Sequence, residues 1–96
     1  MFEIRTTDVF ERWIEGLTDR RTRSVIFNRI DRLAAGHFGD SKSVGDRVFE
    51  LQVFYGPGYR LYFTRKGREC IVLLCAGDKS TQHTDIERAK RLREEV

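Results

Sequence analysis

Two short turns between three apolar segments, in the middle of this chain, restrict its fold more than any other feature. The apolar segments span residues 48–54, 59–65 and 69–76, and each has the length and composition of a β-strand. The turns contain Gly56-Pro57-Gly58 and Lys66-Gly67-Arg68, and glycine and proline are typical of tight reversals. Since turns this short join antiparallel neighbours, we predict a three-stranded antiparallel meander.

The N-terminal third of the chain is predicted to contribute one strand and two helices. Residues 2–6 alternate apolar and polar side chains, which is the period of a half-buried strand. Asp8 can cap a first helix, and Thr18-Asp19 opens a second one, which ends at Gly36. Because the connection between the two is very short, we predict a helical hairpin. Its apolar stripes are Phe10, Trp13, Ile14 and Leu17 in the first helix, and Ile26, Ile30, Leu33 and Ala34 in the second.

The remaining segments complete an α+β fold. Residues 37–46 are polar and without periodicity, so we predict a loop there. Residues 81–95 carry Ile86 and Ala89 at helical spacing. The predicted order is βαα-βββ-α, a small, mostly antiparallel four-stranded sheet with the helical hairpin on one face and a short C-terminal helix.

Composition restricts the size of the core and the class of partner. Ninety-six residues suffice for one core, so we expect residues 1–96 to form a single domain. The formal net charge is +3 and the pI is about 9.1, which favours an anionic partner such as RNA or DNA. No run is long enough to cross a membrane, and the start lacks the apolar core of a signal peptide. We therefore expect a cytoplasmic protein without a membrane partner.

The two cysteines predict neither a disulfide nor a metal site. Cys70 and Cys75 are five positions apart on one predicted strand, so alternation places them on opposite faces, where they cannot bond to each other. Neither belongs to a group of Cys and His residues at metal-ligand spacing. We expect free thiols in a reducing cytoplasm, and no metal or cofactor.

Strand alternation predicts one buried face and one open face of the sheet. In the second and third predicted strands the apolar side chains share a face, which we expect the helical hairpin to cover. The last strand is apolar on both sides, so we expect it to be central and to deliver Lys79 beside the open face. The open face is then expected to carry Glu50, Gln52, Arg60, Tyr62 and Thr64.

The residues at this face suggest a site for phosphate groups. Arg60 carries a planar guanidinium that matches a phosphate with two parallel hydrogen bonds. Lys79 precedes the last helix, whose free N–H groups, together with the hydroxyls of Ser80 and Thr81, favour an anion. The aromatic residues that can stack on unpaired bases, as in proteins that hold single-stranded RNA, are Tyr59 and Tyr62.

Two further side chains suggest cleavage of RNA by its own 2′-hydroxyl. Glu50 is the candidate general base, and His83 is the candidate acid because histidine titrates close to neutral pH. Arg60 and Lys79 would stabilise the charge that grows on phosphorus. The alternative interpretations are a structural Glu50–Arg60 salt bridge across two strands, plain strand positions for the tyrosines, and a surface position for His83.

Three segments together carry a family resemblance. They are residues 48–51 (Val-Phe-Glu-Leu), residues 55–63 (Tyr-Gly-Pro-Gly-Tyr-Arg-Leu-Tyr-Phe) and residues 73–82 (Leu-Leu-Cys-Ala-Gly-Asp-Lys-Ser-Thr-Gln), followed by Asp85-Ile86. This combination, at this spacing and over essentially the whole chain, resembles the addiction-module killer proteins. These are the HigB-type, phage-derived branch of the RelE/ParE toxin superfamily.

The resemblance implies the toxin of a type II toxin–antitoxin (addiction) module. RelE-like members cleave mRNA at the ribosomal decoding site without a metal, which implies a ribosome-dependent endoribonuclease (an mRNA interferase) that inhibits translation. It also implies a cognate antitoxin, commonly a helix-turn-helix protein, which neutralises the toxin and through which the pair binds operator DNA. Arg60 matches the family's arginine at the scissile phosphate, and Lys79 falls where the superfamily has a basic residue. Glu50 and His83 resemble the acid–base residues of some members.

Two departures from the family pattern keep other functions open. RelE proteins carry a tyrosine near the C-terminus, which the last predicted helix lacks, and His83 is followed by Thr84 where some members have tyrosine. ParE-like relatives share the fold but inhibit DNA gyrase and have no nuclease site. The alternatives are therefore a non-enzymatic, gyrase-inhibiting toxin and a degenerate protein that only binds its antitoxin.

Overall fold

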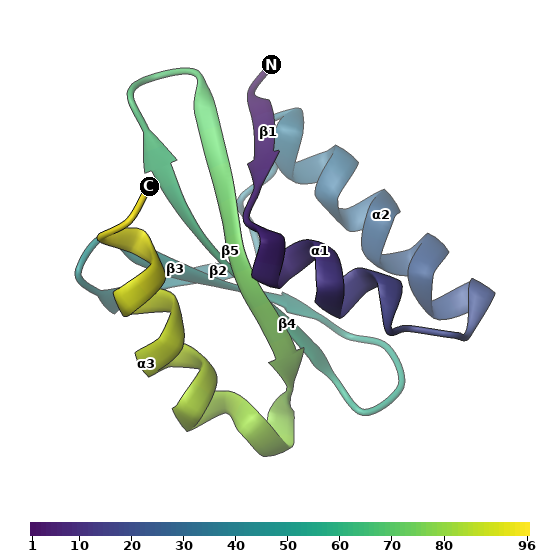
Figure 1. The fold of residues 1–96 in the computed structure, drawn as a ribbon. Helices are drawn as coiled ribbons and strands as arrows, with labels where there is room; N and C mark the ends of the chain where they lie inside the picture. The colour runs from purple at the N-terminus through teal and green to yellow at the C-terminus, as the bar shows by residue number, and fades with distance from the viewer.

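Five strands and three α-helices make up the computed structural model, which describes residues 1–96. The strands are β1 (Glu3–Thr6), β2 (Ser41–Gly45), β3 (Val48–Val53), β4 (Tyr59–Lys66) and β5 (Cys70–Asp78). The helices are α1 (Asp8–Glu15), α2 (Arg20–Ala34) and α3 (Gln82–Arg93), with a short 3₁₀ turn (Lys79–Thr81) before α3. The strands form one sheet in the order β1-β5-β4-β3-β2, and Figure 1 shows α1 and α2 on one side of it and α3 on the other. The α+β class is as predicted.

The first core lies between the sheet and the α1–α2 hairpin. Its strand side chains come from the apolar faces of β3, β4 and β5, and the helical stripes pack against them. Each fully buried side chain of this kind contributes about 1.5–3 kcal/mol to folding. The predicted helical hairpin on one face of the sheet is therefore confirmed. The buried helical residues are Phe10, Ile14, Ile26, Ile30 and Leu33.

The helix ends follow ordinary capping chemistry. The N-cap of α1 is Thr7, whose hydroxyl oxygen accepts a backbone N–H of the first turn at 3.1 Å, so the prediction that Asp8 caps this helix is wrong by one position. Asp19 caps α2 as predicted and accepts from the backbone N–H of Thr22 at 3.0 Å. Gly36, at φ 95°, follows the end of α2 in a left-handed conformation that glycine adopts readily. None of the helices has the length and apolar character that a membrane span requires.

The sheet has a fifth strand, so the predictions of four strands and of a loop throughout residues 37–46 are wrong. Strand β2 pairs antiparallel with β3 at the sheet edge and places Lys42 opposite Glu50. Most of its side chains are exposed, so no apolar alternation marks it. The turn into β3 has Asp46 at φ 53° and Arg47 at φ 62°. Because neither is glycine, the usual signal for such a hairpin turn is also missing.

Strand β5, which lies between β1 and β4, contains an irregularity that changes which of its side chains share a face. Tyr62 lies opposite Cys75 and Phe63 opposite Leu73, so Leu74 is an extra residue in β5. As a result Cys70 and Cys75 both face the α3 side of the sheet, and the prediction that they point to opposite faces is wrong. Both are buried free cysteines. Burial raises the pKa of the Cys75 thiol to about 12.

The face that was expected to be open is covered by α3. Figure 1 shows α3 on this side of the sheet. Ala89 of α3 is fully buried against the strand side chains there. Glu50 and Tyr62 beneath it are 0% exposed, and Thr64 is 3% exposed. The Thr64 hydroxyl donates to the Arg47 carbonyl at 2.7 Å, which replaces its lost hydration. Alternation identified the side chains that share this face, but it carries no information about what packs on them.

Candidate functional site

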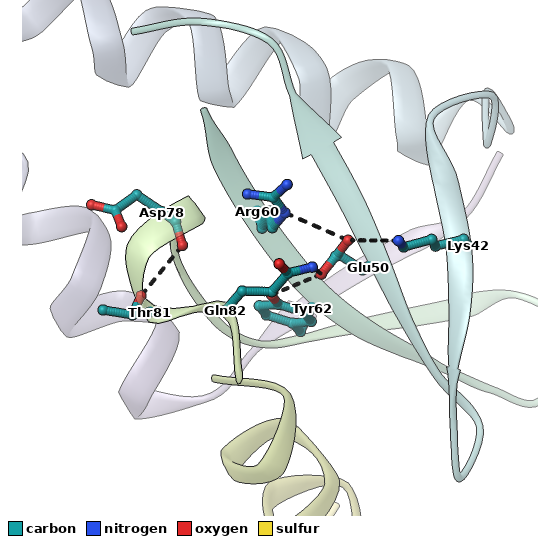
Figure 2. Close-up of polar contacts among 7 residues, drawn as sticks. All are labelled: Lys42, Glu50, Arg60, Tyr62, Asp78, Thr81 and Gln82. Carbon is teal, nitrogen blue, oxygen red and sulfur yellow. Dashed lines mark hydrogen bonds and ion pairs between the residues drawn. The ribbon is translucent and has the colours of Figure 1, made fainter. Parts of the chain in front are cut away.

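Glu50, on β3, has a fully buried carboxylate. Its Oε2 atom accepts hydrogen bonds from the Tyr62 hydroxyl at 3.0 Å and from the Gln82 side-chain amide at 2.8 Å (Figure 2). Tyr62 lies directly opposite on β4, and Gln82 is the first residue of α3, so three elements meet at this oxygen. A carboxylate can be buried at acceptable cost when such donors replace water.

The other carboxylate oxygen of Glu50, Oε1, faces two cations. Arg60 Nε lies 3.6 Å from it and Lys42 Nζ 3.8 Å, which are ion-pair distances and not hydrogen bonds (Figure 2). Neither Oε1 nor Arg60 Nε has a hydrogen-bond partner in the protein. The Arg60 side chain is 13% exposed and that of Lys42 62% exposed, so the Arg60 pair is the better shielded from water and the stronger.

The Tyr62 hydroxyl is held in its protonated form. Burial under α3 raises its pKa above the ordinary value, because a phenolate would lose its hydration there. The hydrogen bond to Glu50 and the charge of that carboxylate raise the pKa further. Tyr62 is therefore a fixed donor to Glu50 at neutral pH.

A groove beside the Glu50–Arg60 pair contains both predicted phosphate-binding cations. Arg60 lies opposite Gly77 in the β4–β5 register, and β5 leads directly into Lys79. Arg60, Lys79, Tyr59 and Phe54 line the groove, whose volume is about 190 Å³, and Phe54 is 76% exposed. Two cations and two aromatic rings are a combination that suits a ligand with phosphates and bases.

Short-range contacts at the end of β5 position Lys79. The Asp78 carboxylate accepts from the backbone N–H of Ser80 at 2.8 Å and from its hydroxyl, and these bonds lower the pKa of Asp78. The Thr81 hydroxyl donates to the Asp85 carboxylate at 2.5 Å. A β-carbon at Gly77 would overlap that carboxylate, so only glycine allows α3 to begin this close to β5.

The structure brings Glu50, Arg60 and Tyr62 together and places Lys79 in the groove that Arg60 lines. His83 does not join them. Its imidazole is 91% exposed and lies 3.6 Å from the Glu87 carboxylate, one turn along α3. The predicted acid therefore stands in solvent, apart from the buried carboxylate.

The predicted RNA-binding residues have different surroundings. Tyr62 is 0% exposed, so the prediction that its ring stacks on a base is wrong for this fold. Tyr59 is partly buried and its ring meets Trp13 edge to face at 6.0 Å between centroids. The Ser80 and Thr81 hydroxyls already donate to carboxylates of this chain. Among the four, Tyr59 alone lines the cationic groove.

Sequence reasoning missed two contacts of Glu50. Lys42 lies in a segment predicted to be a loop, and no periodicity indicated the strand that places it opposite Glu50. Gln82 directly follows the Lys-Ser-Thr turn, and no sequence pattern indicates a contact for it. A polar residue at the start of a helix can nevertheless reach a neighbouring strand, as Gln82 does here. Their pairing with Glu50 depends on tertiary packing alone.

Comparisons with known proteins place the chain in a family. The family described as "Phage derived protein Gp49-like (DUF891)" matches residues 12–94. The chain belongs to the Gp49-like family. A Haemophilus influenzae protein, described as uncharacterized, is 46% identical over 94 residues, which cover 98% of this chain and 95% of that relative. The Gp49-like match includes the whole Glu50 site, from Lys42 to Gln82.

Proposed function

We propose that this Gp49-like protein is the toxin of a type II toxin–antitoxin pair, and that it cleaves mRNA on the ribosome without a metal until a cognate antitoxin neutralises it. The observation that carries the proposal is the Arg60 guanidinium, paired with buried Glu50 at 3.6 Å and sharing a groove with Lys79. The resemblance to the HigB-type branch of the RelE/ParE superfamily supports the same assignment.

Arg60 is suited to the scissile phosphate. Glu50 contacts its Nε side, and Figure 2 shows the two terminal nitrogens pointing away from the carboxylate. These nitrogens carry the donors that can bind two phosphate oxygens in parallel. Because the pair already restrains the guanidinium, little conformational freedom is lost when a phosphate binds. Arg60 and Lys79 would then stabilise the charge that develops when the 2′-oxygen attacks phosphorus.

Glu50 fits a positioning role better than that of general base. Its carboxylate is fully buried, one oxygen is occupied by two hydrogen bonds, and the other faces two cations. A base must come within hydrogen-bond reach of the hydroxyl that it deprotonates. In this proposal water or a ribosomal group takes the 2′-hydroxyl proton and another supplies a proton to the leaving 5′-oxygen, since His83 stands in solvent and does not line the groove.

The test is primer extension on a reporter mRNA in a purified translation mixture. Wild type is expected to produce discrete cuts within translated codons, and Arg60→Ala is expected to abolish them. Arg68→Ala is the matched control, since Arg68 is an exposed arginine at the β4–β5 turn, outside the groove. Cuts that persist in Arg60→Ala would contradict the role of Arg60, and uncut mRNA with wild type would contradict the nuclease.

One observation favours a second candidate, a toxin without enzymatic activity. The Glu50 carboxylate is fully buried and does not line the groove, and the Ser80 and Thr81 hydroxyls donate to carboxylates of the chain, which leaves no free strong base in the groove. A ParE-like protein would bind DNA gyrase through the same basic surface. It would reduce DNA supercoiling by purified gyrase and leave the reporter mRNA intact, so the two assays separate the candidates.

A further inference from the structure

Arg29 is a buried cation without a charged partner. Its side chain lies on the inner part of α2 and the residue is 5% exposed. One terminal nitrogen donates to the His37 carbonyl at 3.1 Å, but Nε and the other terminal nitrogen have no hydrogen-bond partner. No ion pair of the protein includes Arg29. Only one of its five N–H donors therefore has an acceptor in the protein.

Burying Arg29 in this way lowers the stability of the folded protein if the residue has only a structural role. A buried charge that lacks a partner destabilises the folded state, and a buried donor without an acceptor adds to that cost. Burial and the nearby Arg32 charge lower the pKa of Arg29, and the Asp40 carboxylate opposes this shift only in part. The single bond to the His37 carbonyl does not offset it, so an acceptor from outside the chain is the simplest explanation.

A cavity provides the space for such an acceptor. Arg29 lines a hollow of about 300 Å³ between α2 and the end of β3. Apolar side chains of Val25, Val53 and exposed Phe54 form part of its wall, and Arg32 and Asp40 add one charge of each sign. The hollow therefore combines an unsatisfied guanidinium with apolar contacts.

We propose that this cavity, defined by Arg29 and Phe54, binds an acidic side chain within an apolar peptide segment of a protein partner. A single carboxylate matches the unused donors of one guanidinium. The apolar wall suits neighbouring aliphatic side chains of the same segment, and the charges of Arg29 and Arg32 exceed that of Asp40 by one, which matches one carboxylate and not a run of phosphates. The inference does not depend on the cleavage proposed above.

The cavity adjoins the groove of the candidate site. Gln52, Val53 and Phe54 line both this cavity and the groove of Arg60 and Lys79. A bound segment of several residues would therefore reach the edge of that groove. A protein partner of this kind can occupy both hollows along the end of β3.

The test follows the Arg29 Nε–H signal by NMR in the wild-type protein, so it does not require a variant to fold. The probes are a capped pentapeptide with a glutamate between leucines, its glutamine counterpart, and a single-stranded RNA decamer. The glutamate peptide at millimolar concentration is expected to shift the Arg29 signal, and the other two are not. A shift of the Arg29 signal with RNA alone would assign the cavity to nucleic acid. No shift with any of the three probes would show that water satisfies Arg29. Either result overturns the proposal.

Variants then separate binding from stability. Arg29→Met is expected to weaken glutamate-peptide binding by about tenfold, because a charge-assisted hydrogen bond is lost. The matched control is Arg23→Met, since Arg23 is exposed on α2 and does not line the cavity. If Arg29→Met does not fold, Arg29→Lys keeps the charge but not the guanidinium fork, and it should also weaken binding. Unchanged affinity in a folded variant overturns the role of Arg29.

Discussion

The Arg60 Nε atom lies 3.6 Å from Glu50 Oε1, and the two residues sit diagonally on neighbouring strands of one sheet face. Glu50 is fully buried while Arg60 is 13% exposed, so the pair joins the α3-side core to the groove at the surface. The relationship explains why a carboxylate is tolerated in this core. It also makes the orientation of Arg60 a property of the fold and not of the ligand.

Glu50→Gln should reduce mRNA cleavage by about tenfold, because Arg60 loses its charged anchor but keeps its own charge. The rate should be measured across neutral pH, and the shape of its pH dependence should match wild type. A loss of about a hundredfold or more, together with a changed pH dependence, would instead identify Glu50 as the general base. Glu69→Gln is the control, since Glu69 is exposed at the β4–β5 turn.

Tyr62→Phe should lower the free energy of unfolding by about 1–3 kcal/mol, because the buried Glu50 carboxylate loses one of its two hydrogen-bond donors. Urea denaturation monitored by circular dichroism measures the change. Tyr55→Phe serves as the matched control, since no hydrogen bond of the Tyr55 hydroxyl is present. Equal stability of both variants would show that water replaces the lost donor.

Gly77→Ala should destabilise the fold by about 1–3 kcal/mol, because the new β-carbon overlaps the Asp85 carboxylate at the start of α3. Thermal unfolding compares this variant with Gly39→Ala, where the added methyl group meets no atom within 4 Å. A Gly77→Ala variant as stable as Gly39→Ala would mean that α3 can move away from β5 without cost.

Asp19→Asn should reduce the decrease in the free energy of unfolding that acid causes. Hydrogen bonds from Thr22 lower the pKa of Asp19 in the folded protein. Such a group stabilises the fold above its unfolded pKa of about 3.9, and this contribution disappears as the pH falls through the lower folded value. Asparagine is also a good N-cap, so stability near neutral pH should change little.

Urea unfolding at several acidic pH values measures this effect. Asp31→Asn, at an exposed position in the same helix, is the control. If Asp19→Asn and wild type lose stability in parallel below about pH 4, the Asp19 cap does not contribute to acid unfolding.

Local patterns predicted much of the framework correctly. The two helices before the meander, the turns at Gly56 and Gly67 and the three strands of the meander all depend on neighbours in sequence, and these appear in the structure. The same alternation correctly placed Glu50 and Arg60 on one face. Edge strand β2 was not predicted, because most of its side chains are exposed and its sequence therefore shows no apolar alternation.

The amino-acid sequence by itself determined the three helices, the strands other than β2, and which side chains of β3 and β4 share a face, because periodicity and turn chemistry act over a few residues. Only the tertiary structure decided that α3 covers the Glu50 face, that Lys42 and Gln82 contact Glu50, and that Arg29 is buried beside a cavity. These depend on contacts between residues far apart in the chain. No local pattern encodes them, since they follow from how the elements fill space together.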